Sequence, residues 1–349
     1  MDSKCSQIKT TLKNLLDLRT RFDEVYSRVD ESKGRQDTEN MQAIEFSESL
    51  MKEMQEAIKK FEKLIWVSLE EAQEIMNKGR KQNFMGPEQI KTAFGIELQP
   101  EQIPSIPFNE KELNRARKLG QFLVLRVNQV FSSNDPLKAE PLTMEKLNEM
   151  LSPKFEDEIK GEVLYRSSHT IHWYPDEDFY TKETPQAGWA LVSKDVIPHS
   201  GNEPSVDEKR NYLVQTEKLI EYLKYQVFAG RKMPPIFSQA IKEFEEIRKR
   251  EQLDRIIKDD WGKAAQILAN LKITQLLRQS PVEILYDELI YFQNTGQRLL
   301  KQVFTWSRRL DSGGNLILVG YNDTDGIHVI KYKPDESGDY LGTCISRRV

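Results

Sequence analysis

The stretch that decides the fold lies at residues 303–349. It reads Val303-Phe-Thr-Trp-Ser-Arg-Arg-Leu310, Asp311-Ser-Gly-Gly314, Asn315-Leu-Ile-Leu-Val-Gly-Tyr321, Asn322-Asp-Thr-Asp-Gly326 and Ile327-His-Val-Ile-Lys-Tyr332. It then continues Lys333-Pro-Asp-Glu-Ser-Gly338 and Asp339-Tyr-Leu-Gly-Thr-Cys-Ile-Ser-Arg-Arg-Val349. Runs of β-branched and aromatic residues alternate with clusters of Gly, Asn, Asp and Pro, which is the pattern of strands joined by tight turns. We therefore predict a small antiparallel sheet at the end of an otherwise mostly helical chain.

The composition of the whole chain excludes several classes of protein. Of 349 residues, 38% are hydrophobic and 30% charged, so the chain is long enough for two or three domains, each with its own core. No apolar run reaches the roughly 20 residues of a membrane span, and the first residues lack the apolar core of a signal peptide. The net charge of −4 comes from interleaved acids and bases, unlike the basic surface of a nucleic-acid binder. We expect no membrane span and no nucleic-acid partner.

Cysteine usage predicts a reducing compartment. The chain has two cysteines, Cys5 and Cys344, one near each end. They do not form a pair with metal or redox spacing, so a disulfide framework and two-cysteine chemistry are excluded. We expect a cytoplasmic protein.

Two long amphipathic helices are predicted at the start of the chain. In residues 6–30, and again in residues 41–69, apolar side chains recur every three or four positions between charged ones. The polar break between the runs contains Gly34. Two such helices form either an intramolecular hairpin or an oligomeric coiled coil, and the pattern leaves both readings open.

A proline-rich segment separates this helical module from the rest. Residues 99–108 hold Pro100, Pro104 and Pro107 within a short stretch of mixed polarity, which is typical of an extended linker. We therefore divide the chain into a helical module at residues 1–98, a linker at 99–108 and an α+β domain at 109–349.

The α+β domain is predicted from the order of its elements. Strand-like runs occur at residues 121–131, 163–166, 170–174 and 188–193, and helical patterns follow from 205 to 278. Ser205 with Glu208 fits a capping box, and Ser280-Pro-Val-Glu283 is the sharpest helix start of the chain, opening a helix that runs to the sheet at Val303. We expect the early and the final strands to meet in one antiparallel sheet with helices on one side.

An acidic loop offers the most tempting chemical constellation in the chain. His169 and His172 precede Asp176, Glu177 and Asp178, a set of residue types that can bind a metal or perform acid–base chemistry. In a strand, however, an odd separation puts the two histidines on opposite faces. We read the loop as a solvated acidic turn, with a metal-dependent enzyme as the alternative function.

The tail residues divide into two groups. Leu316, Val319, Gly320, Gly326, Val329, Leu341, Gly342 and Ile345 have the character of a sheet framework. The residues between them are aromatic and small polar types that dominate binding surfaces, where rigid aromatic area combines with adaptable hydrogen bonding. The candidate ligand contacts are Tyr321, Asn322, Asp323, Thr324, His328, Ile330, Tyr332, Asp339 and Tyr340. A protein that uses its N-terminal coiled coil as the functional part, with the sheet as a cap, is a further alternative.

Several landmarks of the tail resemble a known family. They are Phe304-Thr-Trp-Ser-Arg, Gly313-Gly-Asn-Leu-Ile-Leu-Val-Gly-Tyr, Asp325-Gly-Ile-His-Val and Leu341-Gly-Thr-Cys-Ile-Ser-Arg-Arg. Together they resemble the variable region of proteins diversified by retroelements, which have a C-type lectin fold. The closest likeness is to the formylglycine-generating-enzyme-like subclass. The stretch 183–198, with the helices that follow it through Leu300, is similar to the rest of such domains from uncultured bacteria, and the resemblance does not reach the N-terminal helices.

The resemblance implies a fold and a function. It implies a C-type-lectin-like domain with long helical insertions and a variable region at about residues 303–349, where mutagenesis at adenines would randomise codons. The varied face would bind a macromolecular ligand, with protein as the expected partner class, and the N-terminal helices would allow homo-oligomers. Catalysis is not implied because the paired cysteines of the enzyme subclass are absent, and no lectin-type calcium loop is evident. We therefore expect no catalytic residue, metal or cofactor.

Overall fold

The structure is a computed structural model that describes residues 2–31, 46, 48–58, 67–79, 82–132, 135–158, 160–165, 173–197 and 210–348. The chain combines many helices with three sheets, which confirms the predicted α+β class at that level. It forms two compact units: residues 1–72 with 105–110, and residues 73–104 with 111–349. Residues 73–98, which the sequence assigned to the helical module, therefore belong to the larger unit. In the part of the chain that is described, no helix is long and apolar enough to cross a bilayer.

The smaller unit contains the predicted pair of helices. Helix α1 (Asp2–Glu31) lies beside a helical segment that covers residues 48–58. Leu50 is fully buried, and Arg21 approaches Glu53 at 4.0 Å. The two helices therefore pack against each other along part of their length.

The first sheet of the larger unit joins strands that are far apart in the sequence. Its order is β1 (Phe84–Met85), β2 (Gln121–Arg126), β5 (Gly188–Ser193) and β10 (Ser346–Arg347), with β1 parallel to β2 and the other pairs antiparallel. Every residue of β2 is buried, as its continuous apolar run requires. The predicted pairing between an early strand and the end of the chain is present, between β5 and β10.

The tail forms a second sheet of order β8 (Gly326–Tyr332), β7 (Leu316–Asp323), β6 (Phe304–Leu310) and β9 (Leu341–Gly342). Strands β6, β7 and β8 are antiparallel neighbours, and β9 lies parallel to β6. The prediction of one common sheet is therefore wrong, because β10 joins the first sheet while β9 stays in the second. A separate hairpin consists of β3 (Gln129–Ser132) and β4 (Asp135–Pro141).

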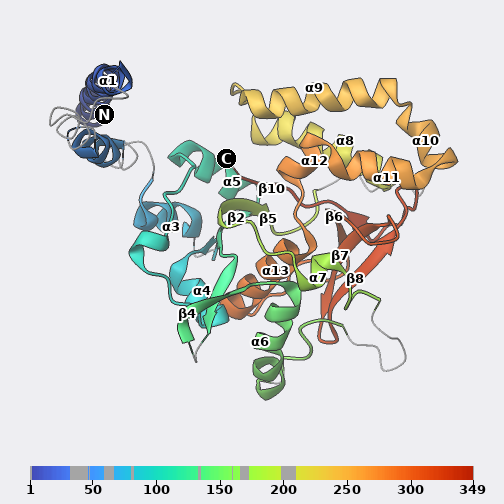
Figure 1. The fold of residues 1–349 in the computed structure, drawn as a ribbon. Helices are drawn as coiled ribbons and strands as arrows, with labels where there is room; N and C mark the ends of the chain where they lie inside the picture. The colour runs from blue at the N-terminus through green and yellow to red at the C-terminus, as the bar shows by residue number, and fades with distance from the viewer. Residues whose placement is uncertain are drawn as a thin grey trace. The chain divides into compact units, whose positions relative to one another are not determined.

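Helix α13 (Pro281–Thr295) is the central element of the larger unit, and it contacts β2, β6 and β7 as well as three other helices (Figure 1). The predicted helix start is present, with one bond of the capping box: Ser280 N–H donates to the Glu283 carboxylate at 2.9 Å. The helix ends at Gly296, whose φ of 70° is a left-handed cap. It therefore stops short of Val303, and the predicted continuous run into the sheet is wrong.

A group of helices covers the second sheet and forms one core with it (Figure 1). Asn211 caps the first of these helices by accepting from Val214 N–H at 3.0 Å, and the proposed start at Ser205 and Glu208 lies outside the described residues. Trp306 of β6 packs edge-on against Tyr212, with ring centroids 5.3 Å apart. The group comprises α8 (Tyr212–Tyr222), a π-helical turn (Leu223–Val227), α9 (Pro235–Arg250), α10 (Leu253–Asp259), α11 (Trp261–Asn270) and α12 (Lys272–Leu277).

Shorter elements complete the fold. Of the strand predicted at 163–166, Leu164 makes only an isolated parallel bridge to Ile327. Of the strand predicted at 170–174, Trp173 and Tyr174 are not in a strand, and residues 170–172 lie outside the described residues. The remaining helices are α3 (Leu69–Asn77), α4 (Pro87–Phe94), a 3-10 turn (Pro100–Gln102), α5 (Glu110–Lys118), α6 (Met144–Asp157) and α7 (Asp178–Thr181).

Candidate functional site

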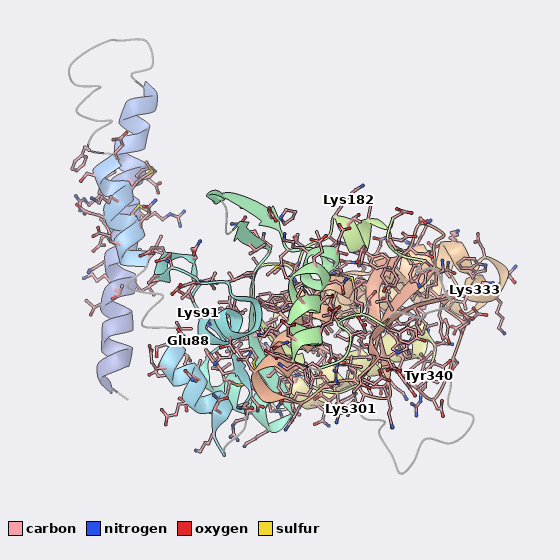
Figure 2. All side chains as sticks on the ribbon, turned by 90° about the horizontal axis from the view of Figure 1, so that it is seen from below. Glu88, Lys91, Lys182, Lys301, Lys333 and Tyr340 are labelled. Atoms are coloured by element: carbon pink, nitrogen blue, oxygen red, sulfur yellow. The ribbon has the colours of Figure 1, made fainter. Side chains whose placement is uncertain are left out.

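Most of the candidate contact residues lie on the surface of the larger unit. Tyr321 is 39% exposed and Tyr340, which Figure 2 labels, is 36% exposed. Thr324 and Asp339 are also exposed, and Asp323, His328 and Tyr332 are half-buried. The framework residues behave oppositely, since Leu316, Val319 and Ile345 are fully buried. The inward positions are therefore as expected, the outward ones are exposed at Tyr321, Thr324, Asp339 and Tyr340 and only partly exposed at the other three, and their binding of a ligand stays a prediction.

Aromatic residues at this surface and directly beneath it are in contact with one another, and among them Tyr321 and Tyr340 are exposed while Phe304 is buried. His328 stacks on Tyr165 with ring centroids 3.9 Å apart and meets the edge of Tyr321 at 5.6 Å. Phe304 stacks on Tyr321 at 5.7 Å and touches Tyr340 at 6.1 Å. We call this continuous group the aromatic face; it consists of Tyr165, Phe304, Tyr321, His328, Tyr332 and Tyr340. Sequence reasoning missed Tyr165 and Phe304 as members, because Tyr165 comes from a distant segment and Phe304 has the pattern of a core strand.

Tyr321 has an unusual backbone conformation. Its φ of 50° is left-handed, a region that costs a tyrosine about 1 kcal/mol or more. Strand β7 has a register irregularity between Gly320 and Asp323, and a Cβ on Gly320 would lie 2.2 Å from the Val303 carbonyl oxygen. The glycine therefore lets the strand approach β6 closely, and the irregularity turns Tyr321 outward.

Partial burial and hydrogen bonding shift the pKa values of His328 and Tyr332 on the aromatic face. Burial lowers the pKa of His328, although Asp323 and Asp325 oppose the shift, so the ring is neutral at pH 7 and carries one donor and one acceptor. The hydroxyl groups of Tyr332 and Tyr340 are 2.7 Å apart. This hydrogen bond raises the pKa of Tyr332 to about 12, with a smaller contribution from burial. The Tyr332 phenol therefore remains an uncharged hydrogen-bonding group.

Two of the candidate contacts have structural roles instead. Asn322 is 1% exposed, donates to Glu288 at 2.6 Å and accepts from Arg298 at 2.8 Å. Ile330 is half-buried and packs against the core of the second sheet. The outward assignment of Asn322 is therefore wrong. The strand irregularity beside Tyr321 changes which side chain faces inward, and sequence alternation does not reveal it.

Helix α13 holds a buried charge network that the sequence did not predict. Glu283 is fully buried and accepts hydrogen bonds from Arg308 and Arg348, each at 2.8 Å. Arg126 of β2 approaches Glu283 at 3.5 Å and pairs closely with Asp287. Burial alone would raise the pKa of Glu283, but the three arginines outweigh it and lower the pKa to about 2. The network fixes both sheets to one helix.

The acidic loop is tied to the tail. Glu177 accepts from the backbone N–H and the hydroxyl of Ser312, at 2.8 and 2.7 Å. Asp178 pairs with Lys182 at 2.7 Å on the surface. His169 and His172 lie outside the described residues. Within the residues that are described, no group of three or more His, Cys, Asp or Glu side chains is placed to hold a metal ion.

Comparison with known proteins returned no relative. No known protein family, no curated protein and no solved structure matches the chain.

Proposed function

We propose that this chain is a ligand-binding protein whose C-terminal sheet presents a variable surface to a macromolecular partner, with protein as the partner class. The observation that carries the proposal is the aromatic face, in which the exposed Tyr321 and Tyr340 and the half-buried Tyr165, His328 and Tyr332 surround the buried Phe304, beside carboxylates and hydroxyls. Exposed tyrosines supply large contact area at low entropic cost, and the neighbouring Asp323, Thr324 and Asp339 supply adaptable polar contacts.

The rigidity of the support favours the same proposal. The strands that carry the face continue into a core made with α8, α9, α11 and α12, and the charge network ties β6 to α13. A surface on such a support tolerates changes in its side chains without loss of the fold. Retroelement-diversified proteins of C-type lectin fold, which the tail resembles, need this tolerance. We propose that the chain belongs to that fold family and that its variation has the same source.

The proposal includes a cytoplasmic location and self-association through the smaller unit. Cys344 is a buried thiol, consistent with a reducing compartment. Leu12, Leu16, Met51 and Ile58 of the helical pair are each more than 40% exposed. Exposed leucines four positions apart on a helix favour pairing with a second copy. Sedimentation of a Leu12→Glu/Leu16→Glu variant tests this part: a wild-type oligomer should become a monomer, and unchanged mass would contradict the pairing.

A library experiment tests the binding surface. Seven positions are randomised in the full chain: Tyr321, Asp323, Thr324, His328, Tyr332, Asp339 and Tyr340. We expect most members to remain folded, and selection on a small folded protein such as a lysozyme should yield binders that depend on the selected side chains. A control library randomises Leu316, Leu318, Val319 and Asn322, and should lose the fold. If the first library unfolds as often as the control, the surface is structural and the proposal fails.

The genomic surroundings test the origin of the variation separately. We expect a reverse-transcriptase gene near the coding sequence, together with an imperfect repeat of the terminal codons that differs at adenines. If both are missing, the retroelement part of the proposal is wrong, whereas the binding surface would still be open to the library test.

A further inference from the structure

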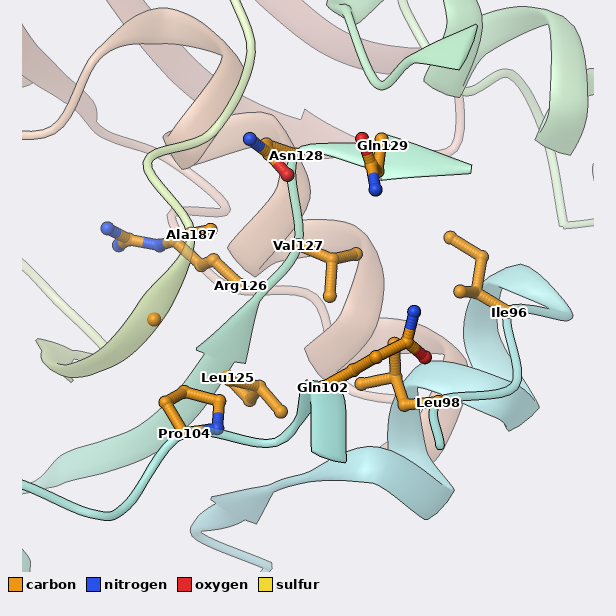
Figure 3. A pocket seen from close by; sticks show the side chains of 11 residues that line it. Ile96, Leu98, Gln102, Pro104, Leu125, Arg126, Val127, Asn128, Gln129 and Ala187 are labelled. Carbon is orange, nitrogen blue, oxygen red and sulfur yellow. The ribbon is translucent and has the colours of Figure 1, made fainter. Parts of the chain in front are cut away.

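A pocket of about 340 Å³ lies in the larger unit, on residues that do not belong to the tail. It is formed where β2 leaves the first sheet, between residues 125–129, the start of β5 at Ala187 and Gly188, and the segment 96–104 (Figure 3). Ile96 and Leu125 are buried at its base, and Leu98 and Val127 are half-buried. The volume and the apolar lining are those of small-molecule pockets, which range from about 300 to 1,000 Å³.

One wall of the pocket is held rigidly. Pro100–Gln102 forms a 3-10 turn in which Gln99 N–H donates to the Gln102 side-chain oxygen at 2.8 Å. The next residues are fixed by Trp189, whose indole N–H donates to the Pro104 carbonyl at 2.8 Å. A wall that is already ordered lowers the entropic cost of binding.

The lining is uncharged where a ligand would contact it. Among the lining residues Arg126 alone is ionic. Its guanidinium is buried, donates to Asp287 and Ser346, and lies 3.5 Å from Glu283. In Figure 3 this side chain runs away from Val127 and Gln102. The other polar groups are the carboxamides of Gln102, Asn128 and Gln129 at the exposed rim. A charged ligand would lose its hydration without gaining an ionic partner.

Gln102 determines the hydrogen-bonding character of the pocket. Its side-chain oxygen accepts from Gln99 N–H, so the amide N–H donors are the part of this group that it presents to the pocket. Figure 3 shows this amide nitrogen directed toward the space between Val127 and Ile96. A ligand therefore needs an acceptor oxygen at that point and an apolar body over Ile96, Leu98, Leu125 and Val127.

We propose that this pocket binds a small, uncharged, mainly apolar molecule that carries a carbonyl or similar acceptor oxygen. The site is separate from the aromatic face. It gives the protein a second ligand of a different chemical class, independent of the surface proposed for a macromolecular partner.

Two probes with the same alkyl chain test the charge and acceptor requirements. In 2-nonanone a heptyl chain carries a neutral carbonyl, whereas in octanoate the same chain carries a carboxylate. Binding to the full chain is measured by calorimetry and by methyl NMR of Ile96, Leu98, Leu125 and Val127. We expect 2-nonanone to shift these methyl signals and to bind about tenfold or more tightly than octanoate, because the pocket offers no cation to the carboxylate. Equal binding of the two probes, or no shift of these signals with 2-nonanone, would overturn the proposal.

Variants of the pocket supply independent checks. Val127→Phe fills the space and should abolish binding of 2-nonanone, whereas Val214→Phe, at a half-buried valine that does not line the pocket, should leave it unchanged. Gln102→Glu keeps the acceptor for Gln99 N–H but removes the donors, and should weaken 2-nonanone about fivefold. Melting curves establish that each variant is folded. Wild-type affinity in a folded Val127→Phe protein would contradict the assignment, whether or not the Gln102→Glu protein also keeps wild-type affinity.

Discussion

The side-chain amide of Asn322 donates a hydrogen bond of 2.6 Å to the carboxyl group of Glu288. The contact joins a buried position in the tail to the central helix α13. The neighbouring Tyr321 is on the surface, so adjacent residues serve opposite purposes. Substitutions at Tyr321, at Asn322 and in helix α13 therefore test the fold most directly.

Glu288 should give the protein a characteristic pH dependence. Burial raises its pKa from 4.5 to about 8, so between these values the folded state binds a proton that the unfolded state has released. The free energy of unfolding should therefore fall as the pH rises from about 5 to 8, by at most about 1.4 kcal/mol per pH unit from this group. Urea unfolding at several pH values measures it. Glu288→Gln should remove this part of the slope, and an identical slope in the variant would contradict the assignment.

Substitutions at Tyr321 and Asn322 should have unequal effects. Tyr321→Asn places a residue that tolerates left-handed φ at a strained position, so we expect a free energy of unfolding within about 1 kcal/mol of wild type. Asn322→Ala removes the partner of Glu288 and Arg298 and should cost about 1–3 kcal/mol. Denaturant unfolding of both variants checks the contrast, which would be refuted by equal losses.

The buried charge network should respond strongly to loss of its central carboxylate. Glu283→Gln leaves Arg126, Arg308 and Arg348 without their shared charge partner, and should destabilise the fold by about 3–5 kcal/mol. The control Asp178→Asn breaks an exposed pair with Lys182 and should cost less than about 1 kcal/mol. A small loss in Glu283→Gln, measured by urea unfolding, would show that the network is not important for stability.

Gly326 should be intolerant of a side chain. Its φ is 112°, and a Cβ would lie 2.4 Å from the backbone nitrogen of Tyr165, the residue that stacks on His328. We expect Gly326→Ala to lower the free energy of unfolding by more than about 2 kcal/mol, as backbone clashes do elsewhere, and to displace Tyr165. Gly230→Ala is the matched control, because Gly230 also has positive φ but open space around it, and it should cost about 1 kcal/mol. Melting temperatures and the NMR signals of the Tyr165 ring distinguish the two.

Cys344 should be chemically inert in the folded protein. Burial raises the pKa of its thiol, so little thiolate forms at neutral pH. In a Cys5→Ser background, we expect labelling with a thiol reagent to be very slow in buffer and rapid in denaturant. Rapid labelling of the native protein would mean that the end of the tail is not packed as described.

The sequence predicted those features that depend on neighbouring residues. The start of α13 follows from Ser280, Pro281 and Glu283 alone, and the strands β6, β7 and β8 follow from turn residues and local alternation. It failed where distant segments decide the outcome. The assignment of β9 and β10 to different sheets depends on which partner each strand meets. Burial of the carboxylates of α13 depends on Arg126 and Arg308, which come from other segments.

The candidate site was predicted in part for the same reason. The exposure of Tyr321 and the partial exposure of His328 and Tyr332 follow from their residue types and positions in the strands. The inward orientation of Asn322 does not follow from the sequence. It depends on a register irregularity in β7, which changes the alternation of inward and outward side chains and leaves no mark in the composition. The apolar pocket also escaped sequence reasoning, since its lining comes from segments that become neighbours only in the fold.

The pairing of β5 with β10 has a consequence for the rate of folding. Ser193 and Ile345 exchange hydrogen bonds although they are 152 positions apart. Such contacts form only after a very long loop has closed, and folding slows as the mean sequence separation of contacts grows. The hairpins β6–β7 and β7–β8 need only short loops, so they should form early. Completion of the first sheet should then be the late, rate-limiting event in refolding.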